Sequence, residues 1–270
     1  MNILITGASG FLGREFAEHY ELMGYNVVRA SRDVIDFTKE EEVDAYFLEN
    51  HVDIVLHTAV KGDDTFLAFV DNINMFNNLR KHYRKYRLMI SFGSGAEFNR
   101  ATDITKAREE DIYCSFPSDH YGLAKNLIAR EINNHNNNII NLRLFGCFGK
   151  YEKTTRFIKN SLRRIREGLP ILVDQDRKMD FFYVKDLLKV IDYFIGADVL
   201  DVVDLNMCYD KKISLSEIAH DINVLTGAPY DAIIQNKVDA LAYTGSSRRL
   251  NKLEIEFEGL EAGIKELNKA

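Results

Sequence analysis

Three glycines near the start of the chain restrict its fold more than any other feature. Gly7, Gly10 and Gly13 follow the apolar run Asn2–Thr6 and open an amphipathic stretch. In this context a glycine-rich turn binds a dinucleotide, because the backbone approaches the pyrophosphate closely and the N–H groups of the following helix meet its charge. An ordinary glycine-rich turn is the alternative. The predicted phosphate-binding residues are Gly7, Ser9, Gly10, Phe11, Leu12 and Gly13.

The first half of the chain alternates short apolar runs with amphipathic stretches. Strands are expected at 2–6, 26–30, 53–57, 87–91 and 139–144, and helices at 11–23, 39–50, 66–83 and 121–134. This rhythm predicts an α/β protein with a Rossmann-type doubly wound parallel sheet. Residues 1–150 are expected to form the dinucleotide-binding core with the catalytic residues. Residues 151–270 are expected to form mainly a smaller C-terminal α/β substrate lobe, with some segments returning to the core.

Two helix starts carry a capping-box pattern. Thr38 with Glu41 is predicted to open the second helix, and Ser214 with Glu217 a helix of the lobe. In such a box the hydroxyl accepts from a free N–H group of the first turn, and the carboxylate accepts from the N–H of the capping residue.

Composition excludes several function classes. The chain has 270 residues, a net charge of −6 and three scattered cysteines. We therefore expect no broad basic surface for nucleic acid, no disulfide framework and no metal site. The first residues already form a strand with no leader before it, and no apolar run has membrane-spanning length, so a cytoplasmic protein without a membrane partner is expected.

The end of the second strand bears on the choice of cofactor. A site for the unphosphorylated dinucleotide usually has an acidic residue there, whereas a 2′-phosphate calls for an arginine and small hydroxyl groups. Ser31 and Arg32 fit the phosphate and favour NADP. The alternative is that both are solvated and that Asp33 binds the ribose of NAD.

A tyrosine and a lysine four residues apart are the candidate catalytic pair. Tyr121 and Lys125 stand near a predicted helix start, so both project from one face. A nearby ammonium favours the phenolate and brings a phenol into range for acid–base work. An amphipathic pair with no catalytic role is the alternative. The pair follows a Gly93-Ser94-Gly95 turn at the end of the fourth strand.

Together these motifs resemble the extended short-chain dehydrogenase/reductases, the NAD-dependent epimerase/dehydratase family acting on nucleotide sugars. The resemblance implies that Ser94 polarises a substrate carbonyl, that Tyr121 exchanges its proton, and that Lys125 holds the nicotinamide ribose and lowers the tyrosine pKa. It implies that Asp36 meets the adenine, or else caps a local turn. The remaining residues that it places at the cofactor or the substrate are Thr58, Ala59, Gly95 and Phe145, while Asn72 matches the helix asparagine of the family or else is an amide on the helix face.

The residues after Ser94 bear on the reaction type. Dehydratases of the family carry an Asp-Glu pair there, whereas this chain has Gly95-Ala96, which argues against dehydration. The chain is most similar to the NADP-dependent reductases such as GDP-fucose synthase, whose Cys and His for double epimerisation correspond to Ala96 and Tyr151. Simple reduction is therefore expected, unless His120 or Cys147 has been recruited.

The predicted lobe departs from the family at two positions, Gly146 and Met179, where relatives carry an Asn and an Arg. Arg177 and Lys178 are expected to bind the diphosphate instead, because a nucleoside diphosphate needs a nearby cation. A basic helix that faces the same ligand, or else is simply solvated, carries Arg156, Lys159, Arg163 and Arg164.

Three functions remain open from the sequence. The first is NADPH-dependent reduction of a 4-keto (deoxy)sugar nucleotide, for which Ser94, Tyr121 and Lys125 form the catalytic set. The second is an NAD-linked C4 epimerase, and the third a dinucleotide-binding regulatory subunit without turnover. The substrate partner is expected to be a nucleotide sugar, and the family resemblance suggests a homodimer.

Overall fold

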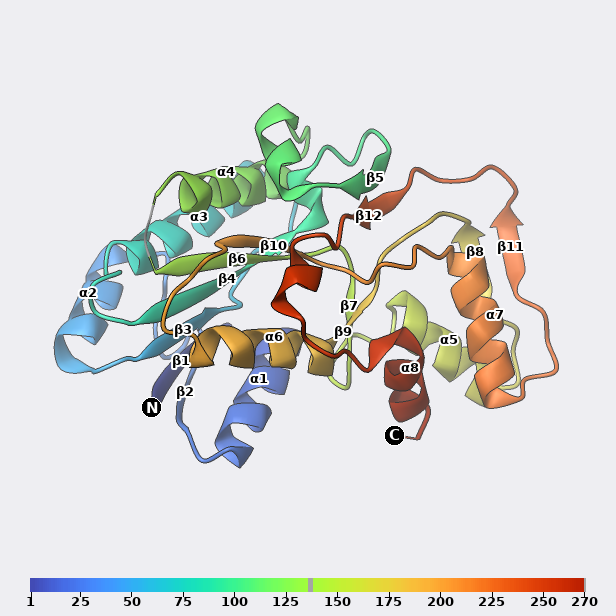
Figure 1. Cartoon of the computed structure of the whole chain (residues 1–270), viewed down its shortest axis with the longest axis horizontal. Coiled ribbons are helices and arrows are strands. Elements are labelled where there is room, and N and C mark those ends of the chain that lie inside the picture. Colours follow the sequence, from blue (N-terminus) through green and yellow to red (C-terminus); the bar gives the residue numbers. More distant parts are fainter. Residues whose placement is uncertain (136–137, 270) are drawn as a thin grey trace.

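A six-stranded parallel sheet forms the centre of the computed structural model, which describes residues 1–135 and 138–269 (Figure 1). Its order, β2-β1-β3-β4-β6-β10, confirms the Rossmann-type prediction. The chain reverses its direction of winding between β1 and β3, and in such sheets ligands bind beyond the carboxyl ends of the strands at that point. The strands are β1 (Asn2–Thr6), β2 (Asn26–Ala30), β3 (Ile54–His57), β4 (Leu88–Ser94), β6 (Ile139–Leu144) and β10 (Asp204–Met207).

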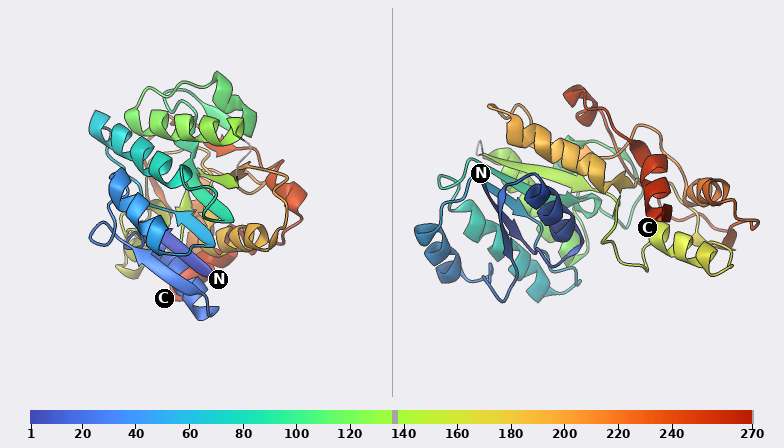
Figure 2. Two further views of the ribbon diagram at one scale, coloured as in Figure 1. Left: turned by 90° about the vertical axis from the view of Figure 1, so that its left-hand side faces the viewer. Right: turned by 90° about the horizontal axis from the view of Figure 1, so that it is seen from below.

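Helices cover both faces of the sheet (Figure 2). One face carries α1 (Phe11–Leu22) and α6 (Val184–Gly196); the other carries α2 (Glu40–Glu49), α3 (Phe66–Arg80) and α4 (His120–Asn134). Alternation along β1 explains the two layers, since Ile3 and Ile5 share a core with Phe16 of α1 while Leu4 packs with Phe47 of α2. Among residues 1–135 and 138–269, no helix combines the length and apolar character needed to cross a bilayer.

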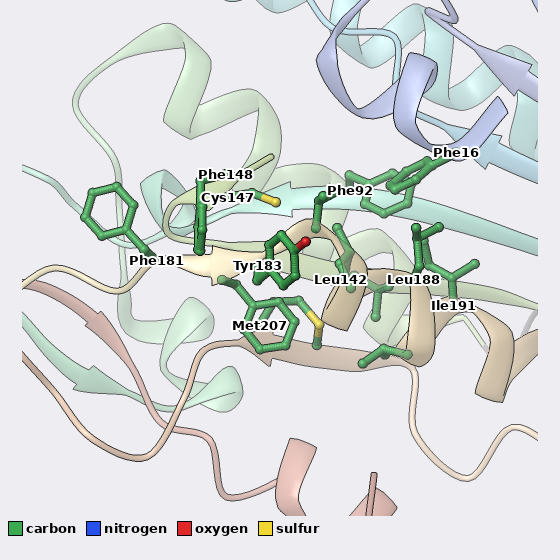
Figure 3. Close-up of a cluster of buried hydrophobic side chains, with 14 of the residues drawn as sticks. Phe16, Phe92, Leu142, Cys147, Phe148, Phe181, Tyr183, Leu188, Ile191 and Met207 are labelled. Carbon is green, nitrogen blue, oxygen red and sulfur yellow. The ribbon is translucent and has the colours of Figure 1, made fainter. Parts of the chain in front are cut away.

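The remaining elements gather beyond one end of the sheet. They are α5 (Phe157–Arg166), β8 (Leu172–Gln175), α7 (Leu215–Thr226), β11 (Ile233–Asn236) and α8 (Gly259–Lys269), together with the parallel pairs β5 (Ile104–Ala107) with β12 (Tyr243–Gly245) and β7 (Cys147–Phe148) with β9 (Phe182–Tyr183). One apolar core runs from Phe16 through Leu142 of the sheet to Phe181 (Figure 3). Apolar packing therefore holds α5, β8, α7 and α8 against the sheet, whereas β5 and β12 pack in a separate cluster with Phe98 and Phe145.

The two predicted capping boxes have different outcomes. At α7 the Ser214 hydroxyl accepts from the Glu217 N–H at 3.1 Å, and the Glu217 carboxylate accepts from the Ser214 N–H at 2.6 Å. The prediction for Thr38 is wrong: α2 begins at Glu40, and the Thr38 hydroxyl donates to the Asp36 carboxylate at 2.7 Å. Asp36 competes for that hydroxyl and its N–H, so a local turn replaces the cap.

Candidate active site

The turn after β1 requires glycine at two positions. Gly7 has a φ of +64°, and a Cβ there would lie 2.7 Å from the Ala59 Cα. A Cβ on Gly13 would lie 2.5 Å from the Gly7 carbonyl oxygen. Gly10 precedes α1, and no side chain caps the helix. The first N–H groups of α1 are therefore left for a ligand, and the close backbone packing forms a cradle that suits a pyrophosphate.

A groove of about 390 Å³ lies over this turn. It brings together every residue predicted for the cofactor apart from the catalytic pair: Gly7, Ser9, Gly10, Phe11, Leu12, Gly13, Ser31, Arg32, Asp36, Thr58 and Ala59. These residues come from the loops after β1, β2 and β3, which meet at the switch point of the sheet. The residues fit a dinucleotide, because an uncapped helix start, small side chains and one arginine share a single groove.

The loop after β2 presents one free cation to this groove. Arg29 points the other way, with its guanidinium paired to Glu21 at 2.7 and 2.6 Å. Arg32 is exposed on the groove, whereas Asp33 is not among the residues that line it. Asp36 lines the groove while its carboxylate accepts from the N–H and hydroxyl of Thr38, as the local-turn alternative expected.

The loop after β3 forms the opposite wall and is held by buried polar contacts. The Thr6 hydroxyl accepts from the Ala59 N–H at 3.0 Å and lies 2.9 Å from His57 Nδ1. Burial lowers the pKa of His57 to about 3, so its ring is neutral. The Asn72 side chain makes two hydrogen bonds of 2.9 Å to the backbone of Lys61. Asn72 therefore positions the loop through Lys61.

A second cavity of about 640 Å³ adjoins the groove, and Phe11, Leu12, Thr58 and Val60 line both. It contains Ser94 at the end of β4, together with Tyr121 and Lys125 one turn apart on α4. Asp119 caps α4 by accepting from the Gly122 N–H at 2.7 Å, which fixes where the helix and its tyrosine begin. The predicted catalytic set thus lies in one cavity that is continuous with the dinucleotide groove.

Burial dominates the electrostatics of the Tyr–Lys pair. The Lys125 ammonium donates to the Phe92 carbonyl at 2.8 Å, and burial lowers its pKa to about 8, against the opposing charge of Glu97. Burial raises the pKa of Tyr121, and the groups that act against this rise are Ser94 and Arg100. The phenol is therefore protonated at neutral pH. The expected lowering of the tyrosine pKa by Lys125 is absent here.

Glu97 is directed away from the cavity. Its carboxylate accepts from the Ser94 N–H at 2.8 Å and from the Arg143 guanidinium. Arg143 also donates to Asp204 of β10 at 2.8 Å, and all three side chains are fully buried. Glu97 is not among the residues that line the cavity. It therefore ties the catalytic turn to the sheet and offers no substitute for a dehydratase carboxylate.

Three of the five residues predicted to bind the substrate line the cavity, and two do not. Ser94, Phe145 and Arg177 line the cavity, whereas Gly95 and Lys178 do not. A Cβ on Gly95 would lie 2.5 Å from the Phe145 ring, so that glycine sits behind the ring. Lys178 is exposed, although its neighbours Arg177 and Met179 line the cavity. Successive side chains of extended backbone point in opposite directions, so Lys178 points away from the cavity.

Of the four residues predicted on the basic helix, Arg156 is the N-cap residue at the start of α5 and the other three lie on it. Arg156 lines the cavity. Lys159 donates to the Lys150 and Glu152 carbonyls at 2.7 and 3.0 Å. Arg163 pairs with Glu167, and Arg164 donates to the Pro170 carbonyl at 2.7 Å. The solvated or locally bonded alternative therefore describes the three later residues.

Gly146 and Met179, the two positions at which the chain departs from the family, line the same wall of the cavity. A Cβ on Gly146 would lie 2.7 Å from the Asp180 carbonyl oxygen, so no larger residue fits this backbone. Met179 lines the cavity, and its sulfur lies 3.6 Å from the Arg177 guanidinium. Cys147 also lines the cavity, whereas His120 does not and instead lies 3.2 Å from Asp64.

Five polar residues of this cavity were not predicted from the sequence: Asp64, Arg100, Glu152, Lys153 and Tyr243. The Tyr243 hydroxyl lies 3.4 Å from that of Ser94. Arg100 pairs with Asp119 at 2.7 Å and lies over the Tyr121 ring, 5.9 Å from its centre. Glu152 lines the cavity beside Arg156. Two of them had a nearby signal: Glu152 follows the family position at Tyr151, and Tyr243 begins β12, where Tyr243-Thr244-Gly245 resembles the ending of the family. Arg100 comes from a loop without such a signal.

A parallel sheet with a glycine cradle at its switch point, joined to a cavity with a Ser, a Tyr and a Lys, defines an enzyme of the short-chain dehydrogenase/reductase class. The chain belongs to the NAD dependent epimerase/dehydratase family, whose pattern it matches over residues 3–207. This match confirms the resemblance that the sequence motifs indicated.

Similar proteins act on nucleotide sugars. GDP-L-colitose synthase of Yersinia pseudotuberculosis is 23% identical over 246 residues, covering 80% of this chain and 79% of that protein. GDP-mannoheptose C4 reductase of Campylobacter jejuni, solved with NADP bound, has a TM-score of 0.81 at 19% identity and covers 100% of this chain and 98% of its own. GDP-D-glycero-L-gluco-heptose synthase of the same organism, solved in the presence of NADPH, has a TM-score of 0.84 at 17% identity, covering 99% and 96%. At these identities the structural likeness concerns the fold.

Proposed function

We propose that this protein is an NADPH-dependent reductase of a 4-keto sugar attached to a nucleoside diphosphate. The observation that supports the proposal is that the groove suited to a dinucleotide is continuous with the cavity that contains Ser94, Tyr121 and Lys125. The relatives named as GDP-sugar synthases and reductases support the same substrate class.

Tyr121 is the proton donor of the proposed reaction. Its phenol is protonated at neutral pH because burial raises its pKa, which suits a group that must give a proton to a carbonyl oxygen. The Ser94 hydroxyl, in the same cavity, donates a hydrogen bond to that oxygen. Bound NADPH would supply the hydride, so that hydride and proton together convert the ketone into an alcohol.

Lys125 positions the cofactor and the tyrosine. Its ammonium is anchored on the Phe92 carbonyl beneath the cavity and keeps further N–H donors for a ribose hydroxyl. Binding an additional acceptor favours the charged ammonium, which in turn favours loss of the Tyr121 proton. The expected influence of Lys125 on the tyrosine therefore belongs to the loaded enzyme.

The loop after β2 favours NADP over NAD. Arg32 is exposed on the groove with Ser31 beside it, and both suit a 2′-phosphate. The turn after Ser94 argues against dehydration, since Ala96 is buried and Glu97 is committed to Arg143. Reduction requires neither an additional acid nor an additional base.

The test is cofactor consumption. Purified enzyme is incubated with NADPH and a panel of 4-keto nucleotide sugars while absorbance at the nicotinamide band is followed. One NADPH oxidised per alcohol formed is the expected result. Tight NADPH binding without consumption argues for the regulatory alternative, and protein that carries NAD and interconverts two hexose nucleotides argues for the epimerase.

A further inference from the structure

One carboxylate in the substrate cavity has no assigned role. Glu152 lies in the loop between β7 and α5 and lines the cavity, yet its side chain is only 3% exposed. Its Oε1 is 3.4 Å from the Arg156 Nε. Within residues 1–135 and 138–269, its buried Oε2 has no hydrogen-bond partner. A buried carboxylate oxygen without a partner is costly, so an atom of this kind in a cavity calls for a donor from a ligand.

The loop holds Glu152 in place from both sides. Toward α1, the Tyr151 N–H donates to Glu15 at 3.0 Å and the Tyr151 hydroxyl donates to Glu18. Toward α5, Lys159 donates to the Glu152 carbonyl at 3.0 Å. Both polar groups of Tyr151 are therefore bound to α1, the helix that follows the glycine turn. Its neighbour Glu152 presents its side chain to the cavity.

The charges around Glu152 indicate which part of a ligand it meets. A carboxylate repels a diphosphate, so the phosphates belong near Arg177 and other cations of the cavity wall. A neutral sugar has hydroxyl groups that donate to a carboxylate. The guanidinium of Arg156, which adjoins Glu152, has further N–H groups that can donate to the oxygens of a sugar. A sugar has hydroxyl groups that both donate and accept hydrogen bonds, so it suits a site with an acceptor, Glu152, beside a donor, Arg156.

We propose that Glu152 recognises the sugar, with its free carboxylate oxygen accepting a hydrogen bond from a sugar hydroxyl beside the Arg156 guanidinium. The assignment rests on the proposed function, because it takes the cavity to hold a nucleotide sugar. It makes Glu152 and Arg156 determinants of which sugar is accepted.

The protonation of Glu152 is consistent with this role. Burial raises its pKa to about 7, while the opposite charges of Arg156 and Lys159 act to lower it. The other ionisable groups nearby are Glu15 of α1 and Cys147 of β7, whose thiol pKa is raised by burial and by both carboxylates. A hydroxyl donating to Glu152 stabilises the carboxylate, so sugar binding is expected to release a proton near neutral pH.

Calorimetry can compare the affinity for a nucleotide sugar with the affinity for its nucleoside diphosphate alone, and the difference reports recognition of the sugar. Protein saturated with NADP is titrated with GDP and GDP-mannose, and with UDP and UDP-glucose. Glu152→Ala is expected to weaken binding of the nucleotide sugar about tenfold or more, since a hydrogen bond to a charged group is lost. Affinity for the nucleoside diphosphate alone is expected to change by less than about twofold. Glu152→Gln, which keeps the size of the side chain, is the second variant.

Glu167→Gln is the matched control, because this exposed carboxylate on the end of α5 pairs with Arg163 outside the cavity. It should change neither affinity. Equal losses for diphosphate and nucleotide sugar in both Glu152 variants, or no loss, would overturn the assignment. If no nucleotide sugar binds the natural protein, the assignment and the proposed function both fail. Binding that depends on Glu152, with no NADPH oxidised by the panel of 4-keto nucleotide sugars, would leave the assignment standing and refute the reductase.

Discussion

The hydroxyl oxygens of Ser94 and Tyr243 lie 3.4 Å apart, although 149 positions separate the two residues in the chain. The contact forms because β12, which begins at Tyr243, pairs with β5 after the catalytic turn. The Tyr243 ring packs edge-on against Phe145, with ring centres 5.3 Å apart. Tyr243 therefore orients the Ser94 hydroxyl. Tyr121, on α4, lies in the same cavity and has a different role.

Removal of the two phenolic hydroxyl groups should separate these roles. Tyr121→Phe is expected to lower kcat about 100-fold or more, the usual worth of a positioned proton donor, while NADPH affinity is kept. Tyr243→Phe is expected to lower kcat only about three- to tenfold, because Ser94 keeps its hydroxyl but loses one neutral partner. Steady-state kinetics with a 4-keto nucleotide sugar check both values. Equal effects would show that Tyr243 contacts the reacting oxygen itself.

The loop after β2 should set the cofactor preference through a single residue. Arg32→Glu is expected to weaken NADPH binding about tenfold or more and to leave NADH binding within about twofold, because an exposed arginine faces a 2′-phosphate in only one of them. Fluorescence titration of the nicotinamide gives both constants. Arg29→Ala is the control, since Arg29 pairs with Glu21. Equal losses for the two cofactors would remove Arg32 from phosphate recognition.

The local sequence predicted the first strand and the glycine turn that follows it. Gly13 meets the backbone of Gly7 and Ala8, and Gly7 meets the loop after the adjacent strand β3, so their spacing indicated the cradle. The run Asn2–Thr6 coincides with β1 because its apolar residues are buried on both faces of a parallel sheet.

Prediction failed wherever distant segments meet. The strand β10 carries Asp204 and Asn206, two buried polar residues that accept hydrogen bonds from Arg143 of β6, and no periodicity reveals such a pairing. Lys178 was expected at the diphosphate because of its charge, but the alternation of extended backbone turns it outward. Glu152 was overlooked because the direction of its side chain depends on how Tyr151 is anchored to α1.

The buried network behind the catalytic turn should matter for stability. Glu97→Ala is expected to lower the free energy of unfolding by about 3–5 kcal/mol, because Arg143 is fully buried and loses one of its two carboxylate partners. Denaturant titration measures this loss. Glu110→Ala, which removes an exposed carboxylate paired with Arg249, should cost less than about 1 kcal/mol. A small effect at Glu97 would mean that Asp204 alone balances the arginine.

The pH dependence of stability should reveal the cost of the free carboxylate at Glu152. Its pKa in the folded protein, about 7, lies above the ordinary value of 4.5, so the folded state favours the protonated form. The ionised carboxylate therefore destabilises the fold, an effect that is absent below about pH 4.5 and complete above about pH 7. Glu152→Gln removes the charge and is expected to raise the free energy of unfolding by about 1 to 3 kcal/mol at pH 8 and by almost nothing near pH 4.5. Urea unfolding of both proteins across this range checks the sign. A difference that does not change with pH would mean that Glu152 is hydrated in the folded state, and a loss of stability at pH 8 would mean that its carboxylate already has a partner.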